Sequence, residues 1–91
     1  MGNGAADSNL VRYAYDHGIN YFDTGETYGN GNHERVIGGA MKHMDRSKIF
    51  VTTKIQLKET DTEQSIVDRL GKCLERLETG YVDALFIYAV Y

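Results

Sequence analysis

The sequence predicts an α/β fold in which three parallel strands alternate with three helices, in the order αβαβαβ. From residue 8 onward, helical and strand-like patterns follow one another, which is typical of units that feed a parallel sheet. The 91 residues contain no proline, low-complexity tract or charge run, so no linker is indicated. Because domains cluster near ~100–150 residues, we expect residues 1–91 to form one domain.

The first helix and strand are expected within residues 8–23. Asp7 or Ser8 can cap a helix that runs to about His17, and Gly18 can end it. The apolar positions of this helix recur at helical spacing: Leu10, Val11 and Ala14. Residues 19–23, Ile-Asn-Tyr-Phe-Asp, favour a strand, and the loop 24–31 that follows holds three glycines.

The second helix is expected to begin near Asn32. Its apolar residues repeat at helical spacing: Val36, Ile37, Ala40, Met41 and Met44. Gly38 and Gly39 each weaken a helix by about 1 kcal/mol relative to alanine, unless close packing requires them. Residues 49–54, Ile-Phe-Val-Thr-Thr-Lys, are short and β-branched and predict the second strand.

The third helix is predicted by a capping box that pairs Thr60 with Glu63, and Gly80 can end it. Its apolar positions are Ile66, Val67, Leu70, Cys73, Leu74 and Leu77. The third strand is expected from Val82 to about Tyr88. Its centre is apolar on both faces, as in a strand that is covered on both sides.

Composition excludes several classes of function. A net charge of -3 disfavours nucleic-acid binding, and no apolar run approaches the ~20 residues of a membrane span. The first residues lack the basic and apolar regions of a secretory signal, so we expect a cytoplasmic protein. The single cysteine, Cys73, is expected to be buried. His17, His33 and His43 have no metal-chelating spacing, so we expect all three to be solvated and predict no metal site.

Three polar side chains are predicted to meet where the strands end. Asp23 ends the first strand, Lys54 ends the second, and Tyr28 lies on the glycine-rich loop after Asp23. Active sites of parallel α/β sheets lie at this edge. A tyrosine hydroxyl is a weak acid whose ionised form a nearby ammonium favours. The pattern predicts that Tyr28 donates a proton to a carbonyl oxygen while Asp23 holds Lys54.

Four segments resemble the aldo-keto reductase family in order, spacing and flanking residues. They are residues 18–24 (Gly-Ile-Asn-Tyr-Phe-Asp-Thr), 28–34 (Tyr-Gly-Asn-Gly-Asn-His-Glu), 37–38 (Ile-Gly) and 49–54 (Ile-Phe-Val-Thr-Thr-Lys). The resemblance runs from about residue 7 to residue 88. It implies part of a (β/α)8 (TIM) barrel whose members reduce aldehydes and ketones with NADPH.

The resemblance also implies roles for individual residues of an Asp-Tyr-Lys-His tetrad. Asp23 matches the aspartate, Tyr28 the proton-donating tyrosine, and Lys54 the lysine that tunes it. Tyr88 stands at the histidine position, so the orientation of a carbonyl there differs from the family pattern. By the same analogy, Thr24 lines the ribose of the cofactor.

Other features depart from a complete reductase. A TIM barrel runs to roughly 250 residues, and the family's cofactor contacts come mostly from later strands. The Gly-Asn-Gly at residues 29–31 lacks the spacing of a dinucleotide-binding loop. We therefore expect a partial barrel that binds no NADPH by itself.

Two readings of the function follow. In the first, the trio Asp23, Tyr28 and Lys54 is only an inherited ion pair, or a ligand site without turnover. The protein is then inactive and self-assembles, as a homodimer or homotetramer, through the sheet face that would line a barrel. That face is expected to expose Ile19, Tyr21, Phe50, Thr52, Phe86 and Tyr88. Tyr88 and Tyr91 are then packing residues at a subunit contact. In the second reading, an oligomer builds an active carbonyl reductase site, an oxidoreductase with Tyr28 as proton donor.

Overall fold

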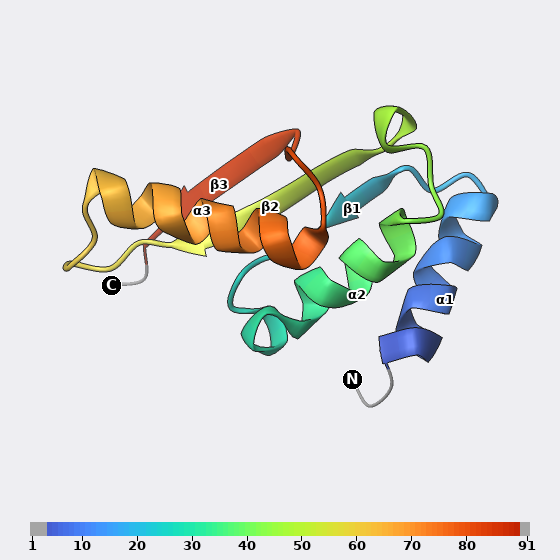
Figure 1. Ribbon diagram of the computed structural model, residues 1–91, viewed down its shortest axis with the longest axis horizontal. Coiled ribbons are helices and arrows are strands. Elements are labelled where there is room, and N and C mark those ends of the chain that lie inside the picture. Colours follow the sequence, from blue (N-terminus) through green and yellow to red (C-terminus); the bar gives the residue numbers. More distant parts are fainter. Residues whose placement is uncertain (1–3, 90–91) are drawn as a thin grey trace.

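The expected alternation of helices and strands is present in the computed structural model, which describes the backbone of residues 4–89 and side chains from residue 7 onward. Tyr91 lies outside the described residues. The elements, labelled in Figure 1, are α1 (Gly4–Asp16), β1 (Tyr21–Asp23), η1 (Tyr28–Gly31), α2 (Asn32–Met41), η2 (Arg46–Lys48), β2 (Phe50–Gln56), α3 (Glu63–Leu77) and β3 (Ala84–Tyr88). Apart from the short η turns, this is the predicted αβαβαβ order.

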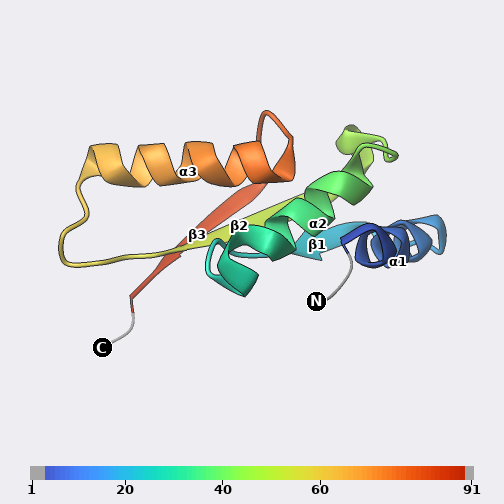
Figure 2. The ribbon, with the colours of Figure 1, turned by 60° about the horizontal axis from the view of Figure 1, so that its bottom comes forward.

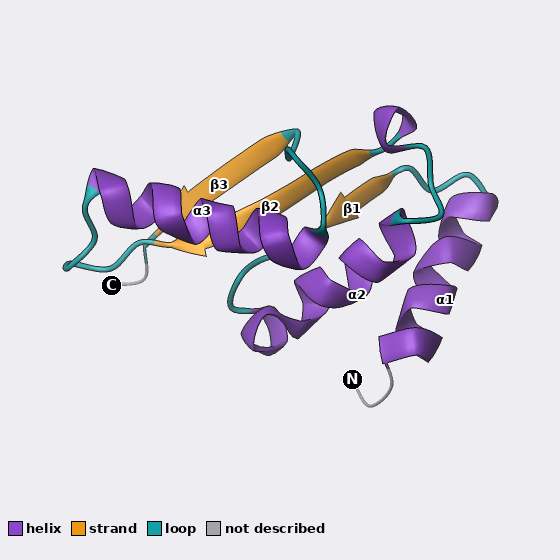
Figure 3. Cartoon of the chain, viewed as in Figure 1, coloured by secondary structure: helices purple, strands orange, loops and turns teal. Residues whose placement is uncertain are grey.

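The three strands form one parallel sheet in the order β1-β2-β3, so β2 is central and the other two are edges. Asp23 pairs with Thr52, and Lys54 pairs with Phe86. All three arrows point the same way in Figure 3, so the carboxyl ends of the strands share one edge of the sheet. The sheet remains open, because three strands cannot close into a barrel.

The core lies between the sheet and its helices. α2 packs between α1 and α3, and Figure 2 shows α3 running across one side of the sheet. The buried cluster combines residues of both layers: Phe22, Ile37, Met41, Ile49, Val51 and Leu77. Because side chains alternate along a strand, Phe22 and Val51 face this core while their neighbours in sequence face away.

The first helix and two strands begin at residues other than those expected. α1 starts at Gly4, so Asp7 and Ser8 lie inside the helix and are not its N-cap; the Ser8 hydroxyl donates to the Val36 carbonyl at 2.8 Å. β1 starts at Tyr21, because the Ile19 N–H donates to Ala14 and closes the end of α1. β3 starts at Ala84, because the Asp83 carboxylate accepts the Val51 N–H.

The ends of α2, β2 and α3 also differ from the prediction. Thr62 caps α3 in a capping box with Ser65, so the expected box of Thr60 and Glu63 is wrong. α3 ends at Leu77 with Glu78 in the left-handed region, and Gly80 does not end it. α2 stops at Met41, short of Met44, and β2 continues to Gln56. At the start of α3, the reciprocal hydrogen bonds of Thr62 and Ser65 take the place of the pair of Thr60 and Glu63 that the sequence suggested.

The sheet face away from the helices exposes most of the side chains expected there. Ile19, Tyr21, Phe50 and Phe86 are about half exposed, whereas Tyr88 is half-buried. Thr52 is fully buried, contrary to expectation, since it lies on the central strand and its hydroxyl donates to Asp23 Oδ1 at 2.5 Å. An aromatic patch of Tyr21, stacked on Phe50, and Phe86 therefore covers this face.

Within residues 4–89, none of the helices is both long and apolar enough to cross a bilayer. Cys73 is fully buried, as expected.

Candidate functional site

Asp23, Lys54 and Tyr28 form one cluster at the carboxyl edge of the sheet. The Lys54 Nζ donates to Asp23 Oδ2 at 2.7 Å and to the Tyr28 hydroxyl at 3.0 Å. Lys54 also lies over the Tyr28 ring, with 4.8 Å between Nζ and the ring centroid. The structure thus brings together the three side chains that the sequence pattern singled out, from two strands and one loop.

The strand pairing and a tight loop place Tyr28. Pairing of β1 with β2 continues past Asp23, because Thr24 N–H donates to Thr52 and Glu26 N–H donates to Lys54. The loop then turns back, with positive φ angles at residues 29–31. At Gly25, a Cβ atom would meet Lys54 Cβ at 3.4 Å and the Tyr28 ring at 3.6 Å. These are ordinary van der Waals distances, so the backbone at Gly25 lies close to both side chains.

The cluster is charged and open to solvent. Burial by itself would raise the pKa of Asp23, but hydrogen bonds from Lys54 and Thr52 outweigh it, so the pKa lies below its usual value. Burial would lower the pKa of Lys54, yet the hydrogen bonds to Asp23 and Tyr28 outweigh it and raise the pKa. At neutral pH the pair is therefore an ammonium and a carboxylate. Tyr28 is 42% exposed, so a small molecule can reach its hydroxyl.

This arrangement is suited to proton donation. The Tyr28 hydroxyl can donate to an acceptor while the Lys54 ammonium, 3.0 Å away, stabilises the phenolate that forms. Asp23 accepts a hydrogen bond from the lysine, and the Thr52 hydroxyl in turn donates to the Asp23 carboxylate and holds it in place. A general acid needs a proton, a stabilising neighbour and access to the substrate, and the cluster offers all three.

Tyr88 and Thr24 lie beside the cluster, and the Thr24 carbonyl accepts a further hydrogen bond from Lys54 Nζ at 3.4 Å. The Tyr88 hydroxyl lies 3.4 Å from Thr27 Oγ1, on the loop that leads to Tyr28. Thr24 is fully buried, and its Oγ1 lies 2.7 Å from His33 Nδ1. The expectation that His33 is solvated is wrong: its ring is half-buried and meets the Tyr28 ring edge-on, with 5.8 Å between centroids.

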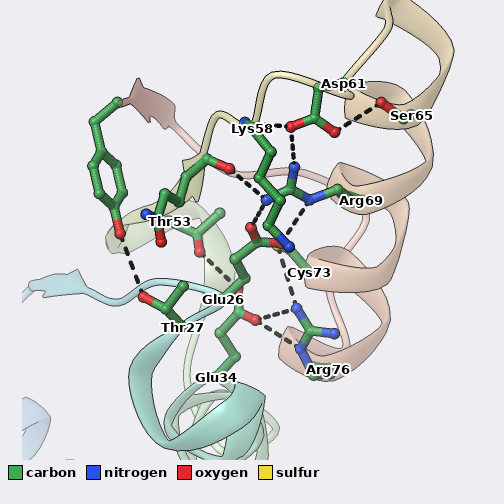
Figure 4. A network of polar contacts seen from close by, with 12 residues as sticks. Glu26, Thr27, Glu34, Thr53, Lys58, Asp61, Ser65, Arg69, Cys73 and Arg76 are labelled. Atoms are coloured by element: carbon green, nitrogen blue, oxygen red, sulfur yellow. Dashed lines mark hydrogen bonds and ion pairs between the residues drawn. The ribbon is translucent and has the colours of Figure 1, made fainter. Parts of the chain in front are cut away.

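A second charged group, which sequence reasoning missed, adjoins the cluster (Figure 4). Arg69 of α3 binds Glu26 through two nitrogens, Asp61 Oδ2 at 2.6 Å and the Gln56 carbonyl at 2.7 Å. The one signal in the sequence is the spacing of Asp61, Ser65 and Arg69 at intervals of four residues, which is helical, although Asp61 lies just before α3. Nothing in the sequence indicates the contact with Glu26, 43 residues away.

A third charged group, also missed, lies between α2, α3 and β2 (Figure 4). Glu34 is fully buried; it accepts from Thr53 Oγ1 at 2.6 Å and from Arg76 Nε at 2.7 Å. Burial, together with the negative charge of Glu34, raises the pKa of the adjacent Cys73 thiol to about 12. This group joins the two helices to the central strand.

The residues near the cluster do not fit the phosphates of a nicotinamide dinucleotide. Phosphate binding needs free cations or a row of backbone N–H groups. Lys54 is paired with Asp23, and Arg69 is paired with Glu26 and Asp61. The hydroxyl of Thr24 is buried against His33 and does not line an open surface. Residues 4–89 also contain no group of three side chains that could hold a metal ion.

Comparisons with known proteins point to one family. Residues 4–91 match the model of the "Aldo/keto reductase family". A Schizosaccharomyces pombe protein named as a voltage-gated potassium channel subunit beta is 39% identical over an alignment of 90 positions that covers 88% of this chain and 26% of that protein. An Arabidopsis thaliana protein with a similar name is 32% identical over 87% of this chain and 26% of its own. The chain spans about a quarter of the length of these curated relatives.

Solved structures agree with the sequence comparison. The thermostable aldo-keto reductase Tm1743, in complex with the inhibitor epalrestat, has a TM-score of 0.89 and 30% identity over 96% of this chain and 31% of its own. An aldo/keto reductase from Klebsiella pneumoniae, in complex with NADP and acetate, has a TM-score of 0.83 and 25% identity over 92% of this chain and 29% of its own. The open sheet thus matches an N-terminal part of an aldo-keto reductase barrel. The chain belongs to the aldo/keto reductase family.

Proposed function

We propose that residues 1–91 carry the proton-donating corner of a carbonyl reductase site and do not turn over a carbonyl substrate by themselves. One observation carries the first half of this proposal: the Tyr28 hydroxyl lies 3.0 Å from a Lys54 ammonium that Asp23 holds at 2.7 Å. The proposed lack of turnover is supported by the side chains around Asp23, Tyr28 and Lys54, which do not fit the phosphates of a dinucleotide. The Klebsiella relative that binds NADP is about three times longer.

In the proposed step, a carbonyl oxygen accepts the proton of the Tyr28 hydroxyl as the carbon is reduced. The Lys54 ammonium stabilises the phenolate left behind, and the carboxylate of Asp23 keeps the ammonium charged and in place. Tyr88, at the position of the family histidine, is proposed to border the bound carbonyl group. These residues account for the proton and leave hydride delivery to groups outside the cluster.

A chimera tests the role of Tyr28. Residues 4–91 would replace the matching segment of the Klebsiella aldo/keto reductase, and NADPH consumption with a simple aldehyde would be measured. Tyr28→Phe is expected to lower kcat by about 10²–10⁴-fold, the usual contribution of a general acid, while cofactor binding stays unchanged. Tyr13→Phe, on the exposed side of α1, is the matched control. Full activity in Tyr28→Phe would refute the assignment.

Titration of the 91-residue polypeptide with NADPH tests its inactivity. We expect no binding by calorimetry at millimolar cofactor and no consumption with an aldehyde. The alternative is an active oxidoreductase whose site is completed by a second copy of the chain. Binding with turnover that disappears in Tyr28→Phe would establish that alternative.

Self-association is the second candidate function, and the exposed aromatic patch favours it. Tyr21, Phe50 and Phe86 lie on the open sheet face, and β1 and β3 both end the sheet with unpaired edges. A homodimer or homotetramer would cover this face. Light scattering should show a multimer that Phe50→Ser and Phe86→Ser dissociate, whereas Leu10→Ser, on exposed α1, leaves it intact. A monomer at the wild-type sequence would exclude it.

The proposed setting is cytoplasmic, without a nucleic-acid partner. The buried thiol of Cys73 and the net negative charge support this setting. Fractionation of cells that express a tagged full-length protein is the direct test.

A further inference from the structure

An ion cluster at the carboxyl edge of the sheet links three segments of the chain. Arg69 comes from α3, Glu26 from the loop between β1 and η1, and Asp61 from the loop between β2 and α3. The side chains are 18%, 14% and 7% exposed, respectively, so water screens these ion pairs less than surface pairs. Figure 4 shows Arg69 lying between the two acids.

Glu26 connects this ion cluster to the proposed proton donor. Its backbone N–H donates to the Lys54 carbonyl at 3.1 Å, and the Tyr28 N–H donates to the Gly25 carbonyl at 3.2 Å. Glu26 is therefore held at both ends, by β2 through its backbone and by Arg69 through its carboxylate. The direction in which the chain leaves Glu26 sets where Tyr28 lies, two residues later.

The geometry of the ion cluster requires an arginine. The guanidinium donates to both oxygens of Glu26, to Asp61 and to the Gln56 carbonyl, and these bonds use all three of its nitrogens. A lysine at this position has one nitrogen and cannot reach all of them with the same fork.

We propose that Arg69 is a positioning residue that, through Glu26, holds the loop carrying Tyr28 so that its hydroxyl reaches Lys54. This inference rests on the proposed function of Tyr28 as proton donor. Arg69 itself makes no contact with the trio among the described hydrogen bonds, so it acts through the loop.

The titration of Lys54 provides a test that needs no activity. The hydrogen bond from Lys54 to Tyr28 contributes to the raised pKa of Lys54, and the 13Cε resonance of the lysine reports that pKa. Tyr28→Phe in the 91-residue chain should lower the pKa of Lys54. Arg69→Gln should also lower this pKa, although every group that bonds to Lys54 is still present. Arg69→Lys should restore part of the lost pKa shift.

Arg46→Gln is the matched control. Arg46 pairs with Asp83 near the start of β3, at the opposite edge of the sheet, and the two side chains are about as buried as Arg69. Its loss should lower stability and leave the Lys54 titration unchanged. Should Arg69→Gln fail to fold, Glu26→Gln removes the charge on the other side of the same contact and should give the same shift.

The outcomes separate the two proposals. A folded Arg69→Gln or Glu26→Gln with the wild-type Lys54 titration overturns the positioning role, while a shift in Tyr28→Phe still supports the Lys54–Tyr28 contact. An unchanged titration in Tyr28→Phe overturns that contact and both proposals with it. In the chimera, Arg69→Gln should lower kcat by about 10-fold or more with little change in KM, as misplacement of a catalytic group does.

Discussion

Two charged groups in this molecule contain ion pairs of similar length but lie in different surroundings. Glu34, Arg76 and Thr53 join α2, α3 and β2, and Glu34 is 0% exposed. Asp23, Lys54 and Tyr28 form the second group, in which Lys54 points from β2 to the opposite face of the sheet from Thr53 and the Asp23 side chain is 44% exposed. Both groups contain an ion pair at 2.6–2.7 Å.

The difference in burial separates stability from chemistry. A buried carboxylate needs its partner, because an unpaired charge costs several kcal/mol in a dry interior. A half-exposed pair contributes little to folding, since water screens it, but a substrate can reach it. The first group should therefore decide whether the fold forms, and the second should matter only for what the fold does.

The strongest test removes the partner of Glu34. Arg76→Met should lower the free energy of unfolding by about 3–5 kcal/mol, because it leaves a buried carboxylate unpaired. Urea unfolding measured by circular dichroism gives this value. Lys42→Met breaks the exposed pair with Glu78 and should leave the midpoint nearly unchanged. Equal losses in the two variants would contradict the comparison.

The reactivity of Cys73 reports on the same buried group. Its pKa is raised from 9.0 to about 12 by burial and by Glu34, so the thiolate fraction near neutral pH falls by roughly 10³-fold. A thiol reagent should label the native protein at least that much more slowly than the protein in urea. Arg76→Met should speed labelling through unfolding, whereas Tyr28→Phe should not. Fast labelling of the native wild type would show that solvent reaches Cys73 and the buried group of Glu34 and Arg76.

Close packing of α2 on α3 gives a smaller effect. A Cβ at Gly38 would lie 2.5 Å from the Arg76 carbonyl oxygen and 2.8 Å from Leu77 backbone atoms, so Gly38→Ala forces the helices apart. We expect a loss of about 1–3 kcal/mol by urea unfolding. Gly71→Ala is the matched control, since nothing lies within 4 Å of its added Cβ. That variant should gain about 0.5–1 kcal/mol of helix propensity.

The smallest effect on stability is expected at Asp23. Its pKa is lowered below 3.8, so the carboxylate stabilises the fold above that pH, and this stabilisation fades as the pH falls through the lowered value. Lys54 has a raised pKa, so its contribution is present below 10.5 and fades as the pH rises through the raised value. Asp23→Asn should differ slightly from wild type in thermal unfolding at neutral pH and not at a pH well below 3.8. A large difference in thermal stability at neutral pH would contradict the expectation that Asp23 contributes much less to stability than Glu34 does.

Local sequence patterns predicted most of the fold. The helical spacing of Val36, Ile37 and Met41 and the β-branched segment 49–54 were enough to place an α2 and a β2. The ends of the helices were less predictable. Thr60 and Thr62 are the same residue type and could cap a helix equally well, and only the hydrogen bond from Ser65 N–H to the Thr62 side chain distinguishes them. Gly38 looked like a weakness in the helix and proves to be the contact point of α2 with α3.

The candidate site was predictable in part for the same reason. Asp23 and Lys54 were each predicted at the end of a strand, so parallel pairing brings them to the same edge of the sheet. The register pairs Asp23 with Thr52, and the Lys54 side chain reaches the Asp23 carboxylate from two residues further along β2. Glu26 and Arg69 carry no such signal, since 43 residues separate them and each looks like an ordinary surface charge. His33 was misjudged because the bond to Thr24 depends on how the loop returns to α2.

The sequence by itself determined the order αβαβαβ, the strands that carry Asp23 and Lys54, and the kinship with the aldo/keto reductases. These follow from periodicity and short motifs, which act over a few residues. Only the tertiary structure decided which charges are buried in pairs and which remain open, because burial depends on residues that packing brings together from distant segments. Glu34 and Asp23 are both single acids in the sequence, and the layer of helices over one face of the sheet buries the first and leaves the second accessible.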